Sequence, residues 1–290
     1  MHARPILSLF LVALAPSAMF AVETPRPVAK VETLPPAPAM QTLTTAKGSK
    51  FGLFGAKPTK PAPTLFMFAQ SVEYMRDRAT FNEVGQRLAA HGYLYVVVDP
   101  PCHGADSKPG EPPELRGWRY RIDQGESLVE PFTQRASDVL DHLVNEGYTD
   151  VAKVAVVGTS RGGFLALHFA AADARIRAVA TFSPVTDLAA LSEFRGDEQH
   201  PTVQSLSTLN LADKLAGRAV WISIGNNDAR VSTEAAIALS RKLVAVGVAK
   251  APPDPKPIVP VELIVGPSSG HSAIQHAHAL AAVWLLKQMQ

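Results

Sequence analysis

The chain has 290 residues, of which 47% are hydrophobic and 19% charged, a balance typical of a folded globular protein and not of a disordered or collagen-like one. The formal net charge is +2, and no basic stripe with interleaved aromatic residues is present, so we expect no nucleic-acid partner. Cys102 is the single cysteine, which excludes an intramolecular disulfide, a zinc ribbon and a CxxC redox site.

The N-terminus has the pattern of an export signal. His2 and Arg4 give a weakly positive start, an apolar run covers residues 6–15, and small residues follow Pro16. We therefore expect residues 1–21 to be a signal peptide. This predicts an exported protein, periplasmic or extracellular, with no stable membrane span after cleavage. A retained membrane anchor is the alternative.

A proline-rich segment follows the expected signal. Residues 22–38 hold five prolines and show no periodicity, so we expect an extended spacer there. The remaining chain, residues 39–290, is expected to form one domain.

Short apolar runs recur along the rest of the chain and predict strands, most of them typical of parallel strands buried on both faces. The expected strands cover residues 40–46, 51–56, 64–69, 93–98, 153–157, 177–182, 219–224 and 261–265.

Amphipathic stretches of helical length lie between most of these runs. The expected helices cover residues 81–91, 131–146, 162–172, 233–246 and 272–288. Repeated strand-helix-strand units predict an α/β fold with a doubly wound, mostly parallel sheet of about eight strands and helices on both faces.

The strongest local signal is the sequence Gly-Thr-Ser-Arg-Gly over residues 158–162. It matches G-x-S-x-G and lies directly after an expected buried strand and before an expected helix, which is the context that a nucleophile elbow requires. An ordinary glycine turn is the alternative. A phosphate-binding loop is excluded because no Lys-Ser/Thr pair follows the glycines. We therefore expect Ser160 to be a nucleophile.

A serine hydroxyl needs a base, and the base needs an orienting acid. Asp228 follows the strand expected at 219–224, and His271 follows the strand expected at 261–265. Sites in such sheets assemble at the carboxyl ends of the strands. Asp187 follows an earlier strand and is the alternative acid, but Asp228 lies in the fuller motif.

These motifs resemble the α/β-hydrolase family over roughly residues 39–290. The matching segments are the elbow at 158–162, the acid loop at 225–231, and Gly270-His271. Within the family, the segments at 160–163 and 183–184 are most similar to prolyl oligopeptidase-type domains and related esterases. The resemblance implies hydrolysis of an ester or amide through an acyl-enzyme, with no cofactor.

The resemblance also implies roles for individual residues. Ser160 would be the nucleophile, His271 the general base and then acid, and Asp228 the group that orients His271. The backbone amide of Arg161 would form one half of the oxyanion hole, and the amide of Ser71, or else of Gln70, the other half.

Two segments are candidate lids near this site, residues 108–130 and 188–215. We expect Gln70, Trp118 and Phe194 to contact substrate. His103 and Cys102 are expected to be structural, and no metal is expected, because His276 and His278 are two residues apart on a helix and cannot share a face.

Three functions remain open at this stage. The leading one is an exported serine hydrolase that acts on a small-molecule carboxylic ester. The second is a prolyl oligopeptidase-like peptidase or aminopeptidase that acts on short peptides. The third is a non-catalytic binding protein on the same scaffold.

Overall fold

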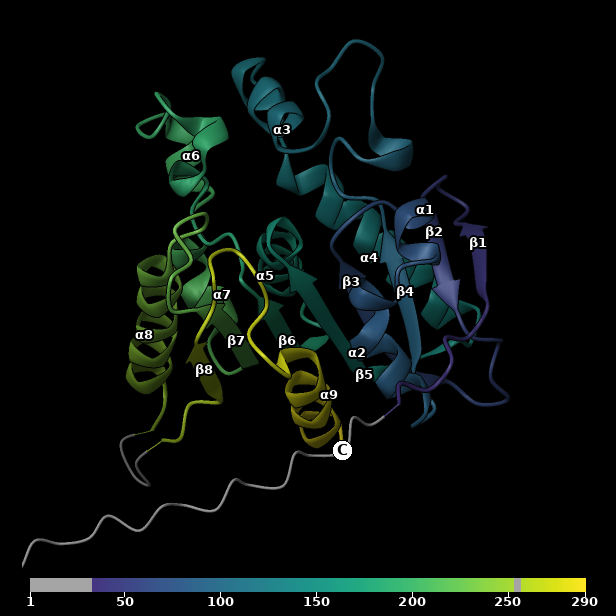
Figure 1. Cartoon of the computed structure of the whole chain (residues 1–290). Coiled ribbons are helices and arrows are strands. Elements are labelled where there is room, and N and C mark those ends of the chain that lie inside the picture. The colour runs from purple at the N-terminus through teal and green to yellow at the C-terminus, as the bar shows by residue number, and fades with distance from the viewer. Residues whose placement is uncertain (1–32, 253–256) are drawn as a thin grey trace, which may run out of the picture. The chain divides into compact units, whose positions relative to one another are not determined.

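Eight strands form one sheet in the computed structural model, which describes residues 33–252 and 257–290 (Figure 1). The strand order is β1-β2-β4-β3-β5-β6-β7-β8. The strands are β1 (Met40–Thr44), β2 (Lys50–Phe54), β3 (Ala62–Phe68), β4 (Leu94–Val98), β5 (Thr149–Thr159), β6 (Ile176–Phe182), β7 (Ala219–Gly225) and β8 (Val261–Gly266). Each of the eight strands expected from the sequence is confirmed.

The sheet is parallel except at one end. β1 pairs antiparallel with β2, and β2 pairs antiparallel with β4, whereas β3, β4, β5, β6, β7 and β8 pair in parallel. The α/β-hydrolase fold with a mostly parallel sheet is therefore confirmed. The expected signal peptide lies outside the described residues, as does most of the spacer.

Helices cover both faces of the sheet. The longer ones are α2 (Ala79–Ala89), α3 (Glu114–Asp123), α4 (Val129–Asn145), α5 (Arg161–Ala172), α8 (Thr233–Lys250) and α9 (Ala277–Gln288). The shorter ones are α1 (Val72–Arg76), α6 (Pro201–Ser205), α7 (Ala212–Leu215) and the 3₁₀ turns η1 (Gly104–Asp106), η2 (Leu188–Ala190), η3 (Ser192–Phe194) and η4 (Thr208–Leu211).

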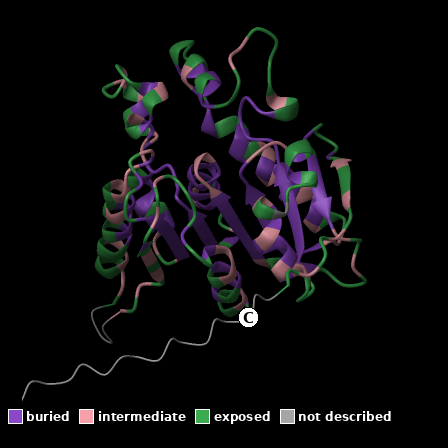
Figure 2. Ribbon diagram, viewed as in Figure 1, coloured by how far each residue is buried: buried purple, intermediate pink, exposed green. Residues whose placement is uncertain are grey.

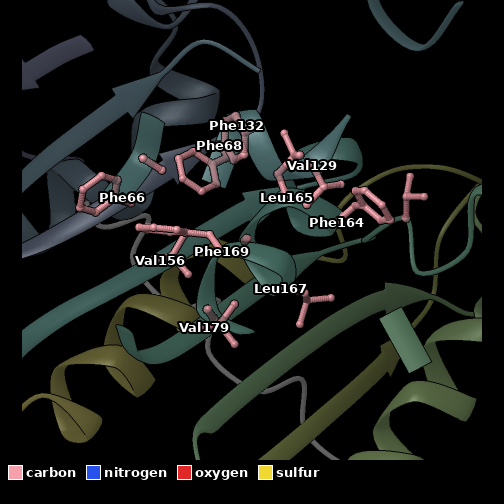
Figure 3. Close-up of a cluster of buried hydrophobic side chains, with 14 of the residues drawn as sticks. Phe66, Phe68, Val129, Phe132, Val156, Phe164, Leu165, Leu167, Phe169 and Val179 are labelled. Carbon is pink, nitrogen blue, oxygen red and sulfur yellow. The ribbon is translucent and has the colours of Figure 1, made fainter. Parts of the chain in front are cut away.

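Side chains of the central strands alternate between two cores. Phe66 and Phe68 of β3 face the cluster formed with α4, α5 and α8, whereas Leu65 and Met67 face the cluster formed with α1, α2 and α9. The central strands are buried while the outer helix surfaces are exposed (Figure 2). Phenylalanines of β3, α4 and α5 fill the first cluster around Phe169 (Figure 3). Burial on both faces explains why the sequence shows continuous apolar runs in these strands.

Glycines mark some helix ends but not all. Gly92 and Gly147 have φ angles of 83° and 74° and follow α2 and α4, as expected for helix C-termini. Helix α8 was expected to end before Gly247, but it continues to Lys250. A Cβ at Gly247 would lie 2.7 Å from Val259, so this glycine allows a close approach of the chain and does not end the helix.

Candidate active site

The turn between β5 and α5 holds Ser160 in a strained backbone conformation. Its φ and ψ angles are 53° and −118°, a region that costs a non-glycine residue roughly 1–3 kcal/mol. At both glycines of the motif, the surrounding backbone leaves no room for a side chain. A Cβ at Gly158 would lie 2.1 Å from the Gly162 oxygen, and a Cβ at Gly162 would lie 1.8 Å from the oxygen of Phe68. The elbow is therefore packed against the end of β3.

Three side chains from separate strand ends form one hydrogen-bonded chain. The Ser160 Oγ lies 2.9 Å from His271 Nε2, and His271 Nδ1 lies 2.9 Å from Asp228 Oδ2. A carboxylate can only accept, so Nδ1 donates to it, and Nε2 accepts from the serine hydroxyl. The imidazole is thus in the tautomer that can take a proton from Ser160.

The carboxylate of Asp228 is fixed by backbone amides. The side chain is fully buried, and its Oδ1 accepts from the amides of Arg230 at 3.1 Å and Val231 at 3.2 Å. These donors satisfy the buried charge and leave Oδ2 for His271. Asp187, the alternative acid, instead accepts from the amide of Ala189 and caps η2.

Two backbone amides near Ser160 are candidates for an oxyanion hole, that of Arg161 at the start of α5 and that of Gln70 in the loop after β3. Arg161 directly follows Ser160, and its Nε donates to the carbonyl of Ala69 at 3.4 Å, which holds the loop after β3 beside the elbow. Gln70, in that loop, lines the cavity at Ser160. Within the described chain, the amides of Gln70 and Arg161 donate to no other group. Ser71 does not line the cavity, and its hydroxyl accepts from the Tyr74 amide and caps α1.

The cavity at Ser160 has a volume of about 350 Å³. Apolar walls come from Phe81, Leu115 and Phe182, while Arg161 and Arg230 provide the cationic side chains. Of the residues expected to contact substrate, the structure places only Gln70 in this lining.

Trp118 and Phe194 were expected to contact substrate, and this expectation is wrong. Both side chains are fully buried in the core. The indole of Trp118 packs on Phe164 and donates to the Pro101 carbonyl at 2.8 Å. Leu115, three positions before Trp118 on α3, reaches the cavity instead. Helical spacing of apolar residues from Leu115 to Ile122 was the signal that this segment has an inward face.

Ion pairs join the two candidate lid segments to the cavity. Arg161 pairs with Glu114 of α3 at 2.9 Å, and Arg230 pairs with Glu193 of η3 at 2.6 Å. Arg119 of α3 also pairs with Asp197 of the second segment. Segments 108–130 and 188–215 therefore contact each other, and each contributes a carboxylate to an arginine of the cavity wall.

Three other titratable side chains, those of Cys102, His103 and His278, do not line the cavity at Ser160. Burial raises the pKa of the Cys102 thiol to about 12, which makes the thiol unreactive. Burial also lowers the pKa of His103, whose Nδ1 contacts the Pro101 carbonyl at 2.7 Å. His278 packs on Phe182 with ring centroids 4.4 Å apart.

The described residues contain no cluster of three or more side chains suited to hold a metal ion. Across the same residues, no helix combines the length and apolarity that crossing a membrane would need.

This fold, with a serine at its elbow, defines a serine hydrolase of the α/β-hydrolase type, as the sequence motifs predicted. The family model of the dienelactone hydrolases, described as "Dienelactone hydrolase family", matches residues 52–251. The match covers more than half of the chain, so the chain belongs to the dienelactone hydrolase family.

Solved structures with the same fold are distant in sequence. Acetyl xylan esterase 1 from Thermoanaerobacterium sp. JW/SL YS485 is 18% identical with a TM-score of 0.63, and the match covers 87% of this chain and 83% of the esterase. Acetyl xylan esterase from Paenibacillus sp. R4 is 16% identical with a TM-score of 0.64, covering 86% and 83%. Porphyromonas gingivalis dipeptidyl peptidase 4 is 17% identical with a TM-score of 0.60, covering 88% of this chain and 36% of the peptidase. No curated protein sequence matches the chain significantly.

Proposed function

We propose that the protein is an exported serine hydrolase that cleaves carboxylic esters of small molecules through an acyl-enzyme intermediate. The observation that carries the proposal is the hydrogen-bonded chain from Ser160 through His271 to the buried Asp228, with both distances at 2.9 Å. A cavity of about 350 Å³ beside the serine is suited to a small substrate.

The proposed reaction begins with proton transfer. The Ser160 hydroxyl gives its proton to His271 Nε2 while Oγ attacks the ester carbonyl carbon. The carbonyl oxygen becomes an oxyanion, which the amides of Arg161 and Gln70 stabilise; losing one such donor costs about 3 kcal/mol of transition-state stabilisation. Gln70 is the better placed of the two residues expected for the second amide because it lines the cavity.

Collapse of the tetrahedral intermediate breaks the bond to the leaving oxygen. The protonated His271 donates its proton to that oxygen, the alcohol departs, and the acyl group stays on Ser160. Water then gives a proton to His271 and attacks the acyl carbon. The bond from that carbon to Ser160 Oγ breaks, the acid leaves, and His271 returns its proton to Oγ, which restores the serine. Asp228 stabilises the imidazolium in both halves of the cycle.

Labelling and turnover test this proposal together. A fluorophosphonate probe should label the wild-type protein, and Ser160→Ala should abolish both labelling and hydrolysis of p-nitrophenyl acetate, with a rate loss of about 10⁶-fold. Activity of Ser160→Ala within tenfold of wild type would refute the assignment. A folded wild-type protein that no probe labels would support a binding protein on this scaffold.

Aminoacyl anilides assayed beside p-nitrophenyl esters separate an esterase from a peptidase. We expect the esters to be the better substrates, because the cavity of about 350 Å³ at Ser160 is suited to a small molecule. Faster hydrolysis of the anilides would assign the peptidase function instead.

Export is a separate part of the proposal and rests on the pattern of residues 1–21. Expression in a bacterial host followed by mass measurement of the fraction outside the cytoplasm tests it. We expect a mass that lacks the signal. An intact N-terminus on the exported protein would assign a retained anchor.

A further inference from the structure

A second cavity lies at the end of the sheet opposite the triad. Strands β5 to β8 run parallel. The residues that follow their carboxyl ends therefore lie at one end of the sheet, and the residues that precede their amino ends lie at the other end. The second cavity is formed at the amino ends of β6, β7 and β8 and has a volume of about 370 Å³. It is therefore as large as the cavity at Ser160 and separate from it.

Arg218 is the fixed cation of this cavity. Its Nη1 donates to the carbonyls of Ile176 at 2.6 Å, Asp173 at 3.2 Å and Ala174 at 3.4 Å. These bonds hold the guanidinium in one position. Its Nε is buried and meets no acceptor among the described residues. A guanidinium held in one position at a cavity is suited to bind an oxyanion.

No carboxylate neutralises Arg218. Within residues 33–252 and 257–290, Arg218 forms no ion pair, because the adjacent Asp173 carboxylate binds Arg175 at 2.6 Å and the Ser137 hydroxyl at 2.8 Å. Burial lowers the pKa of Arg218, and the charge of Arg177 lowers it further against the opposing effect of Asp173.

Arg177 supplies a second guanidinium. It lies in β6, is exposed and lines the same cavity as Arg218. Across the described chain it forms no ion pair with an acidic residue, and no acidic residue lines the cavity. The remaining lining side chains are uncharged, with Ala216, Ala219 and Pro260 on the walls and Gln288 as the polar one.

We propose that this cavity binds a phosphate group, either free or carried by a small organic molecule, between Arg218 and Arg177. Two guanidiniums match the charge of a phosphate and can donate several hydrogen bonds to its oxygens. A phosphate alone fills only part of the cavity, which leaves room for an organic portion against the apolar walls. The site is independent of ester hydrolysis at Ser160.

Calorimetric titration of the full-length protein tests the site with inorganic phosphate, phenyl phosphate and phenol at constant, low ionic strength. We expect saturable binding of the two anions and none of phenol. Arg218→Gln should weaken phosphate binding at least tenfold, and Arg177→Gln at least fivefold. Arg241→Gln, which removes an exposed arginine of α8, should leave the affinity unchanged and is the matched control.

The two anions distinguish the sources of the phosphate group. Tighter binding of phenyl phosphate assigns an organic monoester, and equal binding assigns inorganic phosphate. The proposal is overturned if neither anion binds, if Arg177→Gln binds as wild type does, or if Arg230→Gln at the other cavity abolishes binding. Arg177 makes no bond that the fold requires, so its variant keeps the test decisive even where Arg218→Gln fails to fold.

Discussion

Replacing Asp228 by Asn tests the proposed triad at the group that fixes the imidazole. The side chains are almost the same size, so the fold should be retained. Oδ1 of Asp228 faces the amide donors of Arg230 and Val231. In the variant, the carbonyl oxygen of Asn must take that position, because an NH₂ group there would meet two N–H groups.

The orientation of the Asn side-chain amide determines the tautomer of His271. The Asn NH₂ group would then occupy the place of Oδ2, 2.9 Å from His271 Nδ1. Nδ1 would have to accept, so the ring proton would move to Nε2 and point at the Ser160 hydroxyl. A base in this state cannot take the serine proton.

The expected loss is large and specific. We expect kcat for p-nitrophenyl acetate to fall about 10⁴-fold at neutral pH, which corresponds to about 5 kcal/mol of transition-state stabilisation. The thermal unfolding midpoint should change little. Asp187→Asn is the matched control, and it should keep the wild-type rate. If kcat of Asp228→Asn lies within tenfold of the wild-type value, the role of Asp228 is refuted. A large loss of kcat in the control would transfer that role to Asp187.

Three further predictions concern the frame around the site. Gly162→Ala places a Cβ 1.8 Å from the Phe68 oxygen, so we expect a loss of at least about 3 kcal/mol in the free energy of unfolding, measured by urea denaturation; a wild-type midpoint would contradict the packing argument. Hydrogen bonding to Arg230 lowers the pKa of Glu193, so this pair adds stability above the ordinary glutamate pKa and loses it as pH falls through the lowered value. Glu193→Gln should therefore lower stability by less than about 1 kcal/mol at neutral pH and by nothing at strongly acidic pH in thermal melts; an equal effect at both pH values would count against the ion pair. Trp118→Phe removes the indole donor to the Pro101 carbonyl, which His103 Nδ1 still contacts, so we expect a cost of about 1 kcal/mol of stability with KM unchanged, whereas a raised KM would return Trp118 to the substrate site.

The fold and the positions of Ser160, Asp228 and His271 could be predicted because each is marked by a pattern within a short segment of the sequence. Continuous apolar runs marked the buried parallel strands, and the glycine spacing marked the elbow, where the clashes at Gly158 and Gly162 leave no room for another residue. Asp228 and His271 follow strand ends that a parallel sheet brings to one edge.

The cavity walls could not be predicted with the same success. Trp118 lies in a segment rich in charged residues, and its helical spacing with Leu115 and Ile122 was the one sequence sign that the indole belongs to the core. The pairs Arg161–Glu114 and Arg230–Glu193 join residues far apart in the sequence. Charged side chains of this kind carry no periodicity that would indicate their partners.

The position of His271 after the edge strand β8 has a consequence for biosynthesis. Ser160 and His271 are separated by 111 positions, so a ribosome working at about 5–20 residues per second reaches the histidine codon roughly 6–22 s after the serine codon. Under the proposed mechanism, the nascent chain would carry Ser160 without its proton acceptor throughout that interval. We therefore expect the growing polypeptide to have no hydrolase activity until β8 and the loop that carries His271 have been synthesised.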